Sequence, residues 1–143
     1  MAYVKIEFEK GGVFIARLLE EEAPNTCAAF KKWLPASCLF HHSIVSGQAI
    51  VGLPKNLTAN LENARTVGIY PGTLCFLPRN PALNVPDEIY ITYGPFFVSR
   101  CSTIDFQQPV NVFGRIEERL EELERVGKRI LLQGSEKVMF TLA

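Results

Sequence analysis

Apolar and charged residues alternate at the start of the chain, and this alternation predicts a β-hairpin. Val4, Ile6 and Phe8 occupy every second position and are separated by charged residues. The glycine pair at residues 11–12 can adopt the positive φ angles that a tight turn requires, and a mostly apolar segment follows it. We therefore expect two antiparallel strands, the second covering residues 13–19.

A first helix is expected immediately after the hairpin. Pro24 suits the first turn of a helix, because the N–H group that proline lacks would have no partner there. Cys27, Phe30 and Leu34 follow at helical spacing, and Pro35 ends the pattern.

A second helix is expected near the C-terminal end. Ile116, Leu120, Leu123 and Val126 form an apolar stripe, while the glutamates between them cover the rest of the circumference as a solvated face. Gly127 suits the end of this helix.

The remaining periodic segments predict strands, and many short strands with few helices favour a closed sheet. Five are expected between the helices, at residues 38–45, 48–53, 73–77, 88–93 and 96–101. A further hairpin is expected from residues 129–132 and 137–142, with its turn at residues 133–136. The segments 54–72 and 78–87 remain irregular, and loops of such length in a compact domain are usually functional or disordered.

Composition narrows the class of protein. A chain of 143 residues is expected to form a single domain, residues 1–143, and its 15 basic and 15 acidic residues give no excess charge for nucleic acid or anionic lipid. The first residues resemble no signal peptide and no long apolar run follows, so we expect a cytoplasmic protein that does not enter a membrane. The four cysteines are widely spaced, which predicts buried free thiols rather than a metal site, and no cofactor motif is present.

Several segments resemble those of the cyclophilins, and they occur in the same order. The resemblance implies a mainly β fold, a closed eight-stranded cyclophilin-like β-barrel capped by two α-helices. The segments that carry it are residues 22–26 followed by Phe30, then Phe40-His41-His42, then Phe96-Phe97-Val98, and finally residues 111–116, which match the cyclophilin step into the second helix.

The chain is more closely similar to a bacterial family of uncharacterised small proteins with a cyclophilin-like fold, a domain-of-unknown-function family. This resemblance extends from near residue 4 to near residue 134 and implies the fold without an established activity. The matching residues are Ala23-Pro24-x-Thr26-Cys27, His42, Ser46-Gly47-Gln48-Ala49, Glu62-Asn63-Ala64, Pro71-Gly72 and Glu88-Ile89 leading to Tyr93-Gly94-Pro95.

Departures from the cyclophilin pattern concern its catalytic groups. His42 stands where a cyclophilin has the arginine that, as the family implies, hydrogen-bonds the substrate proline nitrogen. Histidine is mostly neutral at pH 7 and lacks the donor fork of arginine. Pro95 replaces the family's glutamine, Val110 falls near its pocket histidine, and residues 104–106 replace its tryptophan region. The sequence therefore predicts loss of prolyl isomerase activity.

Polar residues near the former catalytic position form a candidate ligand site. His41 and His42 are adjacent on a strand and are expected to face opposite sides, so they cannot share a metal. The residues predicted to bind a ligand are His42, Ser46, Gln48, Tyr93 and Phe97. Alternatives remain open, because a backbone carbonyl could satisfy His42, and the segments Ser46-Gly47-Gln48 and Tyr93-Gly94-Pro95 could serve as turns.

Three other groups of side chains are candidates for a chemical role. Glu62 and Asn63 could cap or close the long loop or contact a ligand, and Arg100 is a candidate anion partner. A nucleophilic pair of Cys38 with either histidine would need hydrogen-bond reach, which strand alternation does not provide.

Three functions follow from these observations. The leading hypothesis is binding of a small polar metabolite in the remodelled cleft, with self-association of the chain as a further expectation. The alternatives are a structural or regulatory interaction subunit of a bacterial metabolic enzyme, and residual peptidyl-prolyl cis-trans isomerase activity.

Overall fold

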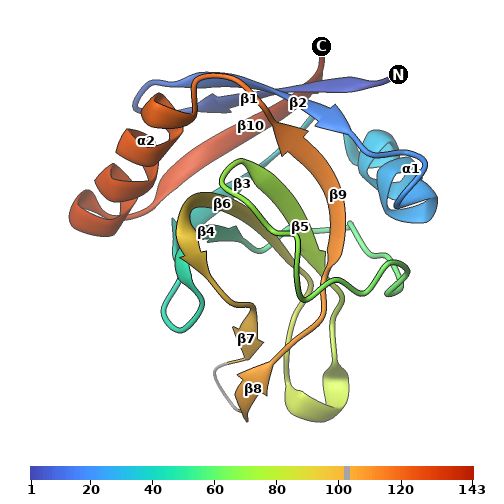
Figure 1. Cartoon of the computed structure of the whole chain (residues 1–143). Helices are drawn as coiled ribbons and strands as arrows, with labels where there is room; N and C mark the ends of the chain where they lie inside the picture. The colour runs from blue at the N-terminus through green and yellow to red at the C-terminus, as the bar shows by residue number, and fades with distance from the viewer. Residues whose placement is uncertain (102–103) are drawn as a thin grey trace.

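The computed structural model contains a closed β-barrel with one helix on either side of it (Figure 1). It describes residues 1–101 and 104–143. The side chains of residues 101 and 104–106 lie outside the described part, and with them the fourth predicted buried thiol, Cys101, and the segment that replaces the cyclophilin tryptophan region. Within the described part, no helix is long and apolar enough to cross a membrane.

The chain begins with a β-hairpin, and its last strand returns to pair with the first. The elements are β1 (Tyr3–Phe8), β2 (Val13–Leu18), α1 (Pro24–Trp33), β3 (Ala36–His42), β4 (Gly47–Gly52), β5 (Thr73–Leu77), the short 3₁₀ helix η1 (Pro81–Leu83), β6 (Glu88–Phe97), β7 (Arg100–Cys101), β8 (Ile104–Gln107), β9 (Asn111–Ile116), α2 (Leu120–Gln133) and β10 (Glu136–Leu142).

Eight antiparallel strands close the barrel in the order β1-β10-β3-β4-β6-β5-β9-β2, and β7 pairs with β8 in a small separate sheet. Alternation along the strands fills the interior, since Val4, Ile6 and Phe8 of β1 are all buried. The same core includes Phe30 of α1 and Val126 of α2, so both helices cover openings of the barrel. The N-terminal hairpin and the closed eight-stranded barrel with two helices are confirmed.

Helix α1 has the buried face that its sequence predicts. Cys27 and Phe30 point into the core, where the Phe30 ring centroid lies 5.0 Å from that of Phe113 and 5.6 Å from that of Phe140. The helix ends at Trp33, because Leu34 is extended and Pro35 cannot continue the helical hydrogen bonds.

Helix α2 is longer than the sequence indicated, and two predictions about its C-terminal part are wrong. Residues 129–132 belong to the helix rather than to a strand, because Ile130 extends the buried stripe of Leu123 and Val126. Each of these side chains contributes about 1.5 to 3 kcal/mol by burial. Gly127 does not end the helix: a Cβ atom there would lie 2.3 Å from the Tyr93 ring, so glycine permits close packing. The helix ends at Gly134, whose φ is +100°.

Strand β6 also differs from its prediction. It continues through Gly94 and Pro95, which were expected to form a turn, and it ends at Phe97. The extra residues are accommodated by a shift in register against β4 between Gly47 and Ala49. The strand expected at residues 96–101 is therefore divided between the end of β6 and the two-residue β7. Ile116 was expected in the second helix but ends strand β9.

Candidate functional site

Strand β3 separates two neighbouring histidines, as alternation predicted. His42 lies on the same side of the strand as Phe40, which is fully buried in the barrel core. His41 lies on the opposite side and lines a pocket on the outside of the barrel. The two imidazoles therefore occupy different environments.

His42 and Tyr93 form a pair beneath α2. The Nδ1 atom of His42 lies 2.8 Å from the Ser43 carbonyl oxygen, which can only accept, so Nδ1 carries the proton. In the neutral imidazole Nε2 is then an acceptor, and the Tyr93 hydroxyl donates to it at 2.7 Å. Burial raises the pKa of Tyr93, which keeps this hydroxyl protonated at neutral pH. The structure thus brings together two predicted site residues, and both ring nitrogens of His42 are engaged internally.

The other three predicted residues lie along the junction of β4 and β6. Gln48 accepts a hydrogen bond from the Phe96 backbone N–H at 3.1 Å. Ser46 is buried, and its Oγ accepts from the Arg100 backbone N–H at 3.0 Å. Phe97 packs edge-on against Tyr90, with ring centroids 5.7 Å apart. Ser46 lines the outer pocket, and Phe97 packs against Tyr90, which also lines it.

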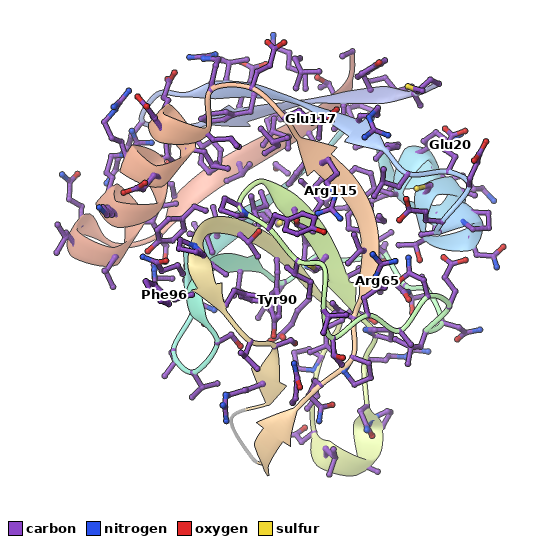
Figure 2. The ribbon with its side chains drawn as sticks, viewed as in Figure 1. Glu20, Arg65, Tyr90, Phe96, Arg115 and Glu117 are labelled. Atoms are coloured by element: carbon purple, nitrogen blue, oxygen red, sulfur yellow. The ribbon has the colours of Figure 1, made fainter. Side chains whose placement is uncertain are left out.

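The outer pocket lies between the β3–β4 loop, residues 84–86, and strands β6 and β7. Figure 1 shows the segment that contains η1 and the β7–β8 sheet extending from the same side of the barrel. The cavity has a volume of about 120 Å³, and its lining residues are His41, Ser43, Ile44, Val45, Ser46, Val51, Asn84, Val85, Pro86, Glu88, Tyr90 and Arg100. The Tyr90 hydroxyl donates to Oε2 of Glu88 at 2.7 Å (Tyr90 is labelled in Figure 2).

Burial changes the ionisation of the pocket groups. It raises the pKa of the Glu88 carboxyl, and the hydrogen bond from Tyr90 offsets part of this increase. Burial and then the neighbouring Glu88 raise the pKa of Tyr90. The pKa of His41 is lowered by burial and by His42, so its imidazole is neutral at pH 7. A carboxyl with a raised pKa in a cavity is a common feature of functional sites.

Sequence reasoning did not assign Glu88 or Tyr90 to a site. The available signal was the acidic residue at the start of an otherwise apolar strand, Glu88-Ile89-Tyr90-Ile91. Arg100, which was considered as an anion partner, does line this pocket.

The described cysteines are not suited to nucleophilic chemistry. Burial raises the pKa of Cys27, Cys38 and Cys75 to about 12 in each case, so all three thiols are protonated at neutral pH. All three are free, as predicted, and Cys27 and Cys75 are buried, whereas Cys38 is only partly buried. Among the described residues, no three His, Cys, Asp or Glu side chains are grouped closely enough to hold a metal ion.

Glu62 and Asn63 fasten the long loop to α1 and β9. Glu62 caps the start of α1, since its carboxylate accepts from the backbone N–H groups of Asn25 at 3.2 Å and Thr26 at 2.6 Å. Asn63 exchanges two hydrogen bonds with the backbone of Val112, at 2.8 and 3.0 Å. Of the two roles considered for this pair, the contacts are those of capping and loop closure.

The fold is shared with solved proteins of low sequence identity. The structure of McbB in complex with tryptophan aligns with a TM-score of 0.69 and 19% identity over 96% of this chain, which spans only 44% of McbB. The hypothetical protein AF2241 from Archaeoglobus fulgidus gives a TM-score of 0.61 with 21% identity, over 99% of this chain and 95% of its own. The Mimivirus cyclophilin gives 0.53 with 14% identity, over 98% and 85%.

Comparison with protein families gives a match along nearly the whole chain. The model of the family described as "Protein of unknown function (DUF3830)" matches residues 6–142. No curated protein matches the sequence. The structural similarities establish a cyclophilin-like fold.

Proposed function

The chain belongs to DUF3830, a family of proteins of unknown function with a cyclophilin-like fold, and we propose that it binds a small polar metabolite in the outer pocket. The observation that carries the proposal is the convergence of Glu88, Tyr90 and His41 on one small cavity. Apolar side chains and convergent polar groups both line this cavity, and polar groups that converge on one cavity are typical of small-molecule sites. The structurally similar McbB was solved in complex with tryptophan, and a small-molecule complex on the same fold supports the proposal.

The residues predicted from the sequence take different parts in this proposal. Ser46 lines the pocket, and Phe97 supports it from behind by packing against the Tyr90 ring, which is part of the lining. His42, Gln48 and Tyr93 instead hold the strands in place through their internal hydrogen bonds. A ligand site at His42 itself stays a prediction, and the experiment below distinguishes the two locations.

A thermal-shift screen of small metabolites is expected to give hits that depend on His41. A ligand present at 100 times its Kd adds about 2.7 kcal/mol to the free energy of unfolding, and tenfold weaker binding would leave about 1.4 kcal/mol. In His41→Ala we expect the ligand-induced increase in the free energy of unfolding to fall to about 1.4 kcal/mol or less, because the His41 imidazole lines the cavity. In His42→Ala we expect this increase, the increment, to be unchanged.

The comparison of the two variants decides the location. Loss of the increment in His42→Ala alone would place the ligand at the site predicted from the sequence. An increment that survives in both variants would refute both sites.

We further propose that the chain lacks prolyl isomerase activity, because His42 has no donor available for a substrate proline nitrogen. Its Nδ1 proton is directed at the Ser43 carbonyl and its Nε2 is occupied by Tyr93. In a coupled assay with a proline peptide, we expect the uncatalysed rate, which reflects a barrier of about 18 to 20 kcal/mol. A cyclophilin serves as the positive control. Acceleration by this chain of tenfold or more would contradict the proposal.

A further inference from the structure

We propose that the outer pocket selects small molecules that carry a protonated amine, with Glu88 as the partner of the ammonium group. This inference rests on the proposed function, because it specifies the ligand class for the same pocket. It follows from the hydrogen bonds and charges around the Glu88 carboxyl.

The Glu88 carboxyl has a neutral partner but no cationic one. Its Oε2 accepts from the Tyr90 hydroxyl at 2.7 Å, and within the described ranges no lysine or arginine forms an ion pair with it. Arg100 lines the same cavity but is engaged in a different interaction. A carboxylate removed from water without a cation is costly, and a bound ammonium group would offset that cost.

The other side chains that line the pocket suit the two parts of a small amine, its ammonium group and its aliphatic stem. An ammonium group has three donors, and Ser43, Ser46 and Asn84, whose side chains carry acceptor oxygens, line the same cavity as Glu88. Val51 and Val85 provide an apolar wall for a short aliphatic stem. A carboxylate ligand would instead place a like charge beside Glu88, and the cavity of about 120 Å³ limits the ligand to a small group.

The ionisable groups of the pocket give amine binding a defined pH dependence. Burial raises the pKa of Glu88, so its ionised form is lost at a higher pH than in an exposed carboxyl. The other titratable or charged groups that face the cavity are His41 on β3, Tyr90 on β6 and Arg100 on β7. As the pH falls, Glu88 loses its charge and His41 gains one, and both changes weaken the binding of a cation. Tyr90 stays neutral because its pKa is raised.

Three probes of matched size test the inference: propylamine, propionamide and propionate. Backbone amide signals of β6 and of Asn84 and Val85 are followed by NMR during titration of each probe into the whole chain at pH 7.5 and 5. We expect propylamine to bind at least tenfold more tightly than the other two, and more weakly at pH 5. Glu88→Gln keeps the shape of the side chain and should weaken propylamine binding at least tenfold.

A matched control and a second variant keep the outcomes separate. Glu117→Gln alters an exposed glutamate that pairs with Arg17 elsewhere on the barrel, and it should leave binding unchanged. Equal binding of propionate or propionamide that is lost in His41→Ala would overturn the amine preference and leave the proposed function standing. Propylamine binding that is indifferent to Glu88→Gln, or absent, would also overturn the inference. The proposed function fails separately if the metabolite screen gives no hit that depends on His41.

Discussion

Glu136→Ala is expected to lower the free energy of unfolding by about 3 kcal/mol or more, because it leaves a partly buried cation without its partner. Glu136 opens β10 and has no exposed surface, and its two oxygens bind Nε and Nη2 of Arg129 at 2.6 and 2.7 Å. Arg129 also donates to the Gly11 carbonyl at 2.8 Å, and Glu136 accepts from the Lys10 N–H at 3.2 Å. The pair therefore joins α2 and β10 to the turn between β1 and β2.

Urea denaturation measures this decrease in the free energy of unfolding, and two further variants are compared with Glu136→Ala. Glu124→Ala breaks the exposed pair with Lys128 on the same helix and is expected to change stability little, since solvent screens exposed pairs. Glu136→Gln keeps part of the hydrogen bonding and should fall between Glu136→Ala and the unaltered chain. A loss below about 1 kcal/mol in Glu136→Ala would mean that Arg129, whose side chain is 23% exposed, recovers its hydration after the substitution.

Asn111→Ala is expected to destabilise the fold by about 3 to 5 kcal/mol and to release the loop of residues 54–72. Asn111 is fully buried, and its Oδ1 accepts from the Glu62 N–H at 2.7 Å. Its Nδ2 donates to the Asn60 carbonyl at 2.8 Å and to Thr26 Oγ at 3.0 Å. Alanine would leave several buried polar groups without partners, at about 1 to 3 kcal/mol for each.

Two measurements separate the loop effect from general destabilisation. Urea denaturation gives the total loss, and hydrogen exchange of the Glu62 and Arg65 amides reports release of the loop. The exposed residue Asn80 provides a control, since Asn80→Ala should leave both readouts unchanged. If the Glu62 amide stays protected in Asn111→Ala, the loop is held by other contacts, such as those of Asn63.

The resemblance to the cyclophilins implied the closed eight-stranded barrel, and local sequence patterns predicted its N-terminal hairpin and its first helix, because these follow directly from burial on one side of each element. The alternation of Val4, Ile6 and Phe8 and the stripe of α1 were sufficient, since a misplaced register would expose them to water. The errors arose where tertiary packing overrides a local rule. Gly127 lies within a helix because the Tyr93 ring occupies the space of a Cβ atom, and Tyr93 is 34 residues away in the sequence, beyond any local pattern.

Only part of the candidate site was accessible from the sequence. Alternation correctly placed His41 and His42 on opposite sides of a strand, but it could not say which side carries a pocket. That depends on the approach of residues 84–86 and Arg100, which no local pattern predicts. The role of Glu88 could not be predicted for the same reason, because its hydrogen bond with Tyr90 and its neighbours in the pocket form only when the strands are assembled.

The two histidines of β3 are consecutive residues, so a substitution at one of them can also affect the other. Residues 41 and 42 share a peptide bond, so a rearrangement of the backbone at one imidazole is transmitted to the other on the far side of the strand. The Tyr93 hydroxyl proton, which is donated to His42, therefore reports whether the backbone of β3 keeps its geometry. Its NMR signal separates a substitution at residue 41 that removes only an imidazole from one that also distorts the sheet.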